Sequence, residues 1–126
     1  MNPRSEFVEH VVETMRTFGP VERKAMFGGW GLYHGGLFFA LVSENVLYLK
    51  VDAESREPFE ARGLPAFVYE SRLGEKTSMH YHQAPEEALE SPEVMAEWAR
   101  RSYAAALRAT TARPAPRRRS TATPRS

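Results

Sequence analysis

The stretch between residues 21 and 51 constrains the fold more than any other part of the chain, because turn residues divide it into short apolar runs. Gly28-Gly29, Gly35-Gly36 and Glu44-Asn45 separate runs at 21–27, 30–34, 37–42 and 46–51. Two-residue turns between such runs are typical of hairpins. The spacing predicts strands over the four runs, with the last three joined as an antiparallel meander.

Helical patterns precede and follow these strands. Apolar residues recur at helical spacing after Asn2-Pro3, at Phe7, Val8, Val11, Val12, Met15 and Phe18. A short middle helix starts at Asp52 or Ser55, and strands over 66–71 and 77–83 form a second hairpin. One helical turn follows at 85–87, and Ser91-Pro92 opens the last helix. We therefore predict an α+β domain, in which an antiparallel β-sheet is flanked by N-terminal, middle and C-terminal helices.

The charges are distributed unevenly along the chain. The sequence holds 17 Lys+Arg and 16 Asp+Glu, but residues 109–126 contain five arginines and no acidic residue. This leaves 12 basic against 16 acidic side chains in residues 1–108. Residues 109–126 also lack Leu, Val, Ile and aromatic side chains. They therefore cannot bury enough apolar surface to offset the loss of conformational entropy on ordering. We expect a folded domain at 1–108 and a disordered basic tail, rich in Arg, Pro, Ala and Thr, at 109–126.

The composition excludes several kinds of site. Without cysteine there is no disulfide framework, thiolate zinc site or cysteine nucleophile. The glycine-rich run lacks the Lys-Ser/Thr pair of a phosphate-binding loop, and no nucleophile elbow occurs. We expect no cofactor and no catalytic residue, and hence a protein that is not an enzyme. No apolar run is long enough to cross a membrane and the N-terminus does not resemble a signal peptide, so we expect a cytoplasmic location.

His80 and His82 are the candidate metal ligands. Alternation along a strand would place both imidazoles on one face, where they could begin a zinc or iron site. Because a third ligand is missing nearby in the sequence, we favour an exposed polar face with Met79 and Tyr81 packed inward. A small metal-binding protein or metal-dependent enzyme that uses the two histidines stays open as an alternative.

Two features suggest contact with nucleic acid. Arg117, Arg118 and Arg119 could bind phosphate, helped by Arg23 and Lys24, although a solubilising end is an equally good interpretation. Aromatic residues also gather in the strands and could stack on bases. Since few basic residues adjoin them, we expect most of these rings to pack in the core: Trp30, Tyr33, Phe38, Phe39, Tyr48, Phe67, Tyr69 and Tyr81.

One run of residues carries a family resemblance. Arg23-Lys24-Ala25-Met26-Phe27-Gly28-Gly29-Trp30-Gly31-Leu32-Tyr33 resembles the signature of the TfoX (Sxy) N-terminal domain family of bacterial competence regulators. The signature positions are Met26, Phe27, Gly28, Gly29, Trp30, Gly31 and Tyr33. Further matches follow in the family's order at 39–40, 47–52, 59–63, 67–69, 79–81, 84–87 and 98–100. The resemblance covers about residues 4–108, as a stand-alone N-terminal domain without the family's C-terminal helical domain.

The resemblance implies a fold related to that of secretion chaperones, and a regulatory role. Full-length members are associated with activating competence genes together with a cyclic-AMP receptor transcription factor. We therefore expect a regulatory or interaction domain, a transcription co-regulator that contacts a protein partner such as a transcription factor. Any nucleic-acid contact would be weak and made by the tail. Pairing of an exposed strand could form a homodimer, and a small-ligand-binding domain with an aromatic pocket beside residues 28–31 is a further alternative.

Overall fold

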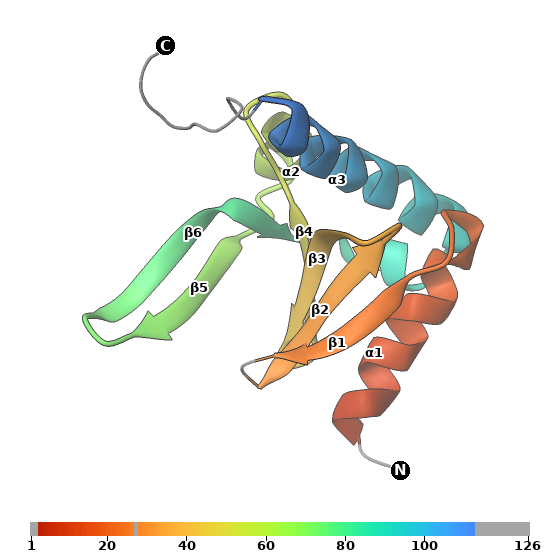
Figure 1. The fold of residues 1–126 in the computed structure, drawn as a ribbon, viewed down its shortest axis with the longest axis horizontal. Coiled ribbons are helices and arrows are strands. Elements are labelled where there is room, and N and C mark those ends of the chain that lie inside the picture. Colours follow the sequence, from red (N-terminus) through yellow and green to blue (C-terminus); the bar gives the residue numbers. More distant parts are fainter. Residues whose placement is uncertain (1–2, 27, 113–126) are drawn as a thin grey trace.

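A computed structural model describes residues 3–26 and 28–112 of the chain (Figure 1). The elements follow in the order α1 (Pro3–Thr14), η1 (Met15–Thr17), β1 (Glu22–Met26), β2 (Gly29–His34), β3 (Leu37–Ser43), β4 (Val46–Lys50), α2 (Arg56–Ala61), β5 (Ala66–Ser71), β6 (Gly74–Gln83), η2 (Glu86–Leu89) and α3 (Pro92–Ala112). The described strands form one sheet in the order β1-β2-β3-β4-β6-β5, and each neighbouring pair is antiparallel. This confirms the predicted α+β fold.

The first four strands form an antiparallel meander: β2, β3 and β4 are joined as the turn residues predict, and β1 pairs with β2 as a further strand. Gly35 and Gly36 connect β2 to β3 with φ angles of 58° and 81°, and Glu44 and Asn45 connect β3 to β4 with φ angles of 52° and 62°. Positive φ at both central residues matches the turn to the twist of the adjoining strands. Glycine adopts this conformation without strain, whereas Glu44 adopts it against the preference of a residue with a side chain.

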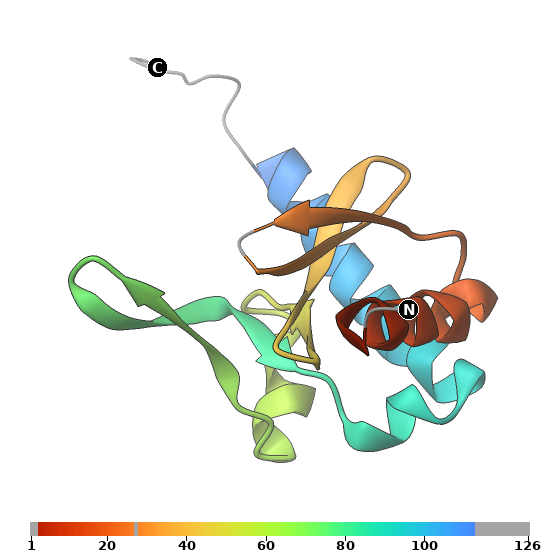
Figure 2. The ribbon, with the colours of Figure 1, turned by 90° about the horizontal axis from the view of Figure 1, so that it is seen from below.

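Strand β6 belongs to two parts of the sheet. Its last residues pair with β4, where Tyr81 lies opposite Lys50, and its first residues pair with β5. The register with β5 jumps from Ala66 opposite His82 to Phe67 opposite Ser78. Such an irregularity bends a strand. The hairpin β5–β6 therefore leaves the sheet and projects away from the helices (Figures 1 and 2).

Helices α1 and α3 pack on one face of the meander (Figure 2). The fully buried side chains there come from the helices and the sheet alike, among them Val8, Val11, Met15, Leu32, Phe39, Leu49, Met95 and Ala99. One buried polar group joins the two layers. The Ser102 hydroxyl lies 3.1 Å from the carbonyl oxygen of Phe39 and 2.8 Å from that of Lys50. Its buried O–H therefore has acceptors to donate to, and it fastens α3 to β3 and β4.

Helix α3 extends beyond the predicted end of the domain. It continues to Ala112, four residues into the segment that we expected to be tail. The added turn is held by local bonds, since the Thr110 hydroxyl donates to the carbonyl oxygen of Leu107 at 2.7 Å. Residues 1–2, 27 and 113–126 lie outside the described part of the chain. Within 3–26 and 28–112, no helix has both the length and the apolar character needed to cross a bilayer.

Candidate functional site: the open face of the sheet

The face of the sheet opposite the helices carries large side chains. Residues directly opposite each other on neighbouring strands point to the same face, which places the following residues together: Tyr33, Phe38, Leu41, Tyr48, Lys50 and Tyr81. We call this surface the open face. Among the described residues no helix lies over it, as Figures 1 and 2 show. All six side chains are half-buried, so part of each one stays accessible to a ligand.

Ring contacts connect the open face to the projecting hairpin. The Phe38 ring lies 5.2 Å from the Tyr33 ring and 5.9 Å from the Tyr81 ring, measured between centroids. The Tyr48 ring lies 4.8 Å from Phe67 of β5, which in turn stacks 5.8 Å from Tyr69. The expectation that most strand aromatics pack in the core is therefore wrong. Of the eight rings only Phe39 is fully buried. Trp30 packs partly buried against the core, and alternation directs the other six away from the helices.

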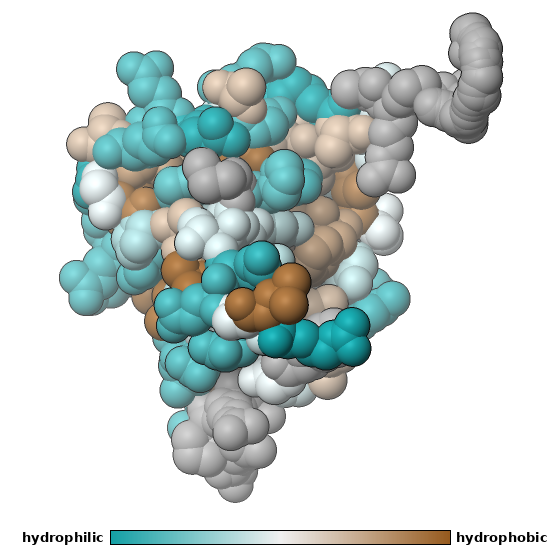
Figure 3. Space-filling model, turned by 90° about the vertical axis from the view of Figure 1, so that its left-hand side faces the viewer, coloured by the Kyte–Doolittle hydropathy of each residue, from teal (hydrophilic) through white to brown (hydrophobic). Residues whose placement is uncertain are grey.

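The bend of the hairpin turns this surface into a groove of about 870 Å³. Its apolar lining comes from the sheet and the hairpin: Met26, Leu41, Tyr48, Phe67, Tyr69 and Tyr81. Viewed from the side on which the hairpin projects, apolar atoms are visible in separate patches among hydrophilic ones (Figure 3). A concave, mostly apolar surface of this size is typical of a binding site.

Three glutamates line the same groove, and we call them the acidic rim: Glu44, Glu70 and Glu75. All three are exposed, and Glu70 lies directly opposite Glu75 across the β5–β6 pair. Like charges in this position repel each other. No described lysine or arginine forms an ion pair with any of them. The groove therefore combines aromatic rings with carboxylates that the described residues do not neutralise.

Burial raises the pKa values of two tyrosines in the groove, and the acidic rim adds to the effect at one of them. Burial raises the pKa of Tyr81 to about 12, with a smaller contribution from the charge of Tyr33. Burial also raises the pKa of Tyr48, and the nearby carboxylate of Glu44 adds to that effect. Both hydroxyls consequently stay protonated at neutral pH and can donate a hydrogen bond to a ligand in the groove.

The two basic residues of the signature point to opposite faces of β1. Lys24 lies on the open face with its Nζ 4.8 Å from the centroid of the Tyr33 ring. Arg23 lies on the helix side, 5.0 Å over the Trp30 ring and 3.3 Å from a carboxylate oxygen of Glu9 in α1. The two side chains thus do not form one basic patch, and the partners of Arg23 hold α1 against the edge of the sheet.

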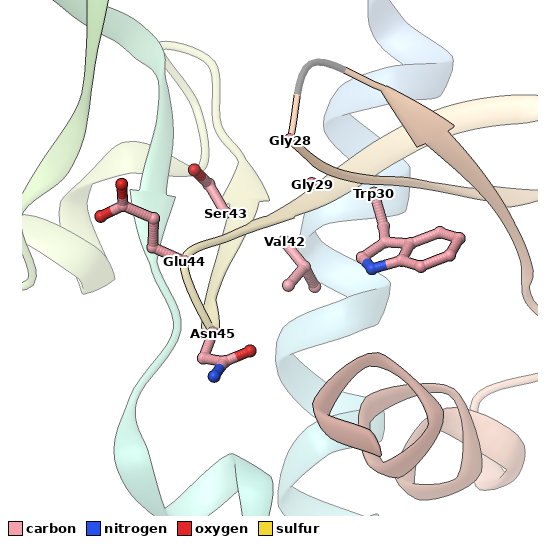
Figure 4. Close-up of a pocket in the computed structure, with 7 residues that line it drawn as sticks. All are labelled: Gly28, Gly29, Trp30, Val42, Ser43, Glu44 and Asn45. Carbon is pink, nitrogen blue, oxygen red and sulfur yellow. The ribbon is translucent and has the colours of Figure 1, made fainter. Parts of the chain in front are cut away.

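Two signature glycines allow close approaches beside the groove. A Cβ atom on Gly29 would lie 2.1 Å from the carbonyl oxygen of Val42, so only glycine fits against β3 there. A Cβ atom on Gly31 would lie 3.0 Å from the Phe38 ring and 3.1 Å from the Met26 methyl, and its absence leaves room for these side chains across β2. A smaller recess of about 460 Å³ adjoins the β1–β2 turn. Figure 4 shows it between Gly28, Trp30 and the β3–β4 turn at Glu44 and Asn45.

The two candidate metal ligands lie in different environments. His82 is only 6% exposed, packs against the Phe59 ring and donates from Nδ1 to the carbonyl oxygen of Leu64 at 2.7 Å. His80 is exposed. The prediction of a shared exposed face is wrong for His82, because the bend of β6 directs it into the core. Among the described residues no group of three His, Asp or Glu side chains could hold a metal ion. The other candidate residues, Arg117, Arg118 and Arg119, lie outside the described part.

A contact that no sequence motif indicated fixes the end of α3. Arg108 donates from Nε and Nη2 to the two carboxylate oxygens of Asp52, at 2.7 and 2.9 Å. Asp52 also accepts hydrogen bonds from the backbone amide and the hydroxyl of Ser55, both at 3.0 Å. Ser55 occupies the N-cap position of α2, but its side chain makes no capping hydrogen bond to that helix. Asp52 is the only aspartate in a Glu-rich chain. That is the one sequence feature that could have indicated its contact with Arg108.

Comparison with known proteins supports the resemblance carried by these residues. The family model described as the TfoX N-terminal domain matches residues 13–106. The match includes β1, the signature glycines, the whole open face and most of α3. A search of curated proteins found no match to the chain.

Proposed function

Because the chain belongs to the TfoX N-terminal domain family, we propose that it is a regulatory domain that works by binding a protein partner, and that the groove on the open face is the binding surface. We further propose that the partner is a component of transcription, so that the chain acts as a co-regulator without catalysis. The observation that carries the proposal is the groove of about 870 Å³ lined with tyrosine and phenylalanine.

Physical chemistry favours a protein as the partner. Tyrosine and phenylalanine are enriched where proteins meet, since each ring buries a large area at a low cost in conformational entropy. Tyr48 and Tyr81 each offer a hydroxyl beside an apolar ring. The groove is shallow and continuous with the hairpin, which suits an extended or helical segment of a partner.

The site offers little to support catalysis. The ionisable groups that line the groove are tyrosines and glutamates. Lys50 lies beside them, with its Nζ 5.3 Å from the centroid of the Tyr81 ring, and the lining supplies no paired nucleophile and base. A small ligand in the recess beside Gly28 and Gly29 is a second candidate, favoured by the 460 Å³ volume. It predicts that a low-molecular-weight compound protects Gly28 and Asn45, which line only the recess, and leaves Phe67 and Tyr69, which line only the groove, unprotected.

A matched pair of variants tests the proposed function in the host cell. Tyr69 in the groove and Leu107 on α3 are 44% and 46% exposed, so glutamate at either position should leave folding intact. In cells that lack the native gene, the wild-type chain and the Leu107→Glu variant should restore the same set of transcripts, whereas Tyr69→Glu should not. Full restoration by Tyr69→Glu, or no transcript that depends on the wild-type chain, would contradict the proposal.

A further inference from the structure

Strand β5 borders the groove with its edge. Four consecutive residues of this strand line the groove: Phe67, Val68, Tyr69 and Glu70. Because successive side chains of a strand point to opposite faces, four consecutive residues can border one cavity only along the edge of their strand. The bend of β6 therefore turns the edge of β5 toward the open face, and the 4.8 Å contact between the rings of Phe67 and Tyr48 holds it there.

This edge has no neighbouring strand among the described residues. The order β1-β2-β3-β4-β6-β5 places β5 at the end of the sheet, so that β6 pairs with one side of it only. Backbone hydrogen bonds alternate along an antiparallel pair, and every second residue of β5 consequently directs its backbone amide and carbonyl groups away from β6. Such a row of free groups is a template for a further strand.

The side chains of β5 leave this edge open to pairing. Val68 and Tyr69 are 47% and 44% exposed. Edge strands that avoid pairing carry lysine and other charged residues. At the opposite edge of the sheet, three of the five residues of β1 are charged, whereas β5 holds one charged residue in six, Glu70. The edge of β5 is therefore the better template of the two.

The charges around this edge favour a basic segment. Glu70 lies directly opposite Glu75 across the β5–β6 pair, and a cation beside both carboxylates would relieve their repulsion. The lysines of the open face, Lys24 and Lys50, lie over tyrosine rings instead. A second copy that paired through its own β5 would bring no cation, because no residue of β5 is basic. The charges therefore favour a strand from a different protein.

We propose that the protein partner adds an extended segment to the free edge of β5, and that this segment alternates apolar and basic side chains. Backbone hydrogen bonds to β5 supply affinity, and the alternate side chains supply specificity. The apolar side chains lie against the rings of Tyr48 and Phe67, and a lysine or arginine on the other face of the segment pairs with Glu70 and Glu75. This inference rests on the proposed function, since it states how the partner occupies the same groove.

A short synthetic peptide that alternates valine and arginine serves as the probe. It is added to the purified, isotope-labelled full chain, and hydrogen exchange is followed at each backbone amide. The proposal predicts that exchange slows several-fold at every second residue from Phe67 to Ser71 and stays unchanged in β1. Unchanged exchange in β5, or equal slowing in both edge strands, would overturn it.

Two methylated peptides form a matched pair that tests backbone pairing. All valines of a strand direct their amides to one edge, and all arginines direct theirs to the other. Methylation of the valine nitrogens or of the arginine nitrogens therefore blocks one edge each. One of the two peptides should lose the effect on β5 while the other retains it. Equal behaviour of the two would show that no strand is added.

Exchange of the charges tests the role of the two glutamates. A peptide that alternates valine and glutamate should not slow exchange in the wild-type chain. In the Glu70→Arg, Glu75→Arg variant, whose substituted positions are exposed, this peptide should act and the valine–arginine peptide should not. An unchanged preference would overturn the pairing of a basic side chain with these residues.

The chain without peptide provides the last comparison. Slowed exchange in β5 that grows with the concentration of the chain alone would show pairing with a second copy and would overturn the proposal. All these measurements use the purified chain and synthetic peptides. They can therefore fail while the transcript test of the proposed function succeeds, and a partner would then bind the groove without adding a strand.

Discussion

The rings of Tyr48 and Phe67 lie 4.8 Å apart, although β6 separates their strands in the order of the sheet. The contact exists because the irregular register near residue 80 bends β6 and brings β5 over the open face. It closes one end of the groove. The shape of the candidate site therefore depends on one aromatic pair as well as on the backbone of the hairpin.

Removing this contact should loosen the hairpin. Phe67→Ala deletes a half-buried ring that touches both Tyr48 and Tyr69, and we expect it to cost about 1–2 kcal/mol. Hydrogen exchange at the amides of β5 and the first half of β6 should accelerate more than exchange in β2 and β3. Val68→Ala is the control, since Val68 is 47% exposed and makes no ring contact. The same acceleration in the control would show that the ring pair does not hold the hairpin.

The contact between Asp52 and Arg108 should make stability depend on pH in the acidic range. Hydrogen bonds from the Arg108 guanidinium hold the pKa of Asp52 well below its usual range. The stability that this carboxylate contributes is complete above the pKa of about 3.9 in the unfolded chain, and is lost as the pH falls toward the folded value. Because both side chains are about one-third exposed, we expect Asp52→Asn to cost about 1–2 kcal/mol at pH 7.

Urea unfolding of the wild type and Asp52→Asn at neutral and acidic pH checks this prediction. The difference in unfolding free energy between the two proteins should shrink as the pH falls below about 4. Arg16→Ala serves as a control, since Arg16 and Glu13 form an ion pair with side chains 71% and 70% exposed. We expect that variant to change stability by less than about 0.5 kcal/mol. A constant difference between wild type and Asp52→Asn at every pH would contradict the assigned cause.

The two signature glycines should differ in their tolerance of alanine. A Cβ atom on Gly29 meets the backbone oxygen of Val42, which cannot move without displacing β3, whereas one on Gly31 meets only the ends of side chains. We expect Gly29→Ala to cost about 3 kcal/mol and Gly31→Ala about 1 kcal/mol, both measured by chemical unfolding. Equal costs would mean that the close approach at Gly29 does not exist in solution.

Tyr81 should link stability to pH in the alkaline range. Its pKa is raised to about 12 by burial, above the value of about 10 in an unfolded chain. Folding therefore favours the protonated phenol, and this stability is present below pH 10 and is lost as the pH rises toward 12. The pKa of Tyr48 is also raised, but ultraviolet titration should show a last-titrating tyrosine near pH 12 that disappears in Tyr81→Phe. If that variant loses as much stability between pH 10 and 12 as the wild type, Tyr81 is not the linked group.

Local signals in the sequence were sufficient to predict the helices and strands of the fold. The turn pairs Gly35-Gly36 and Glu44-Asn45 predicted the meander, and Ser91 before Pro92 predicted the start of α3, where the Ser91 hydroxyl accepts a hydrogen bond from the amide of Val94 at 3.3 Å. These signals are local because a turn or a cap is decided by a few neighbouring residues.

The candidate site could not be predicted in the same way. The groove depends on the bend of β6, and alternation alone placed His80 and His82 on one face when the structure buries only His82. Likewise, no local pattern distinguishes Phe39, which faces the helices, from Phe38, which lies on the open face. Which face of a sheet is covered is decided by long-range packing, and that information is absent from a local window.

The central claim, that a protein partner binds the open face, is tested most directly by photo-crosslinking in the host cell. A photoreactive amino acid replaces either Tyr69 in the groove or Leu107 on α3, positions of nearly equal exposure. We predict that one discrete protein is captured from position 69, and that it is not captured from position 107. Capture of the same protein with equal yield from both positions, or no capture from position 69, would contradict the account.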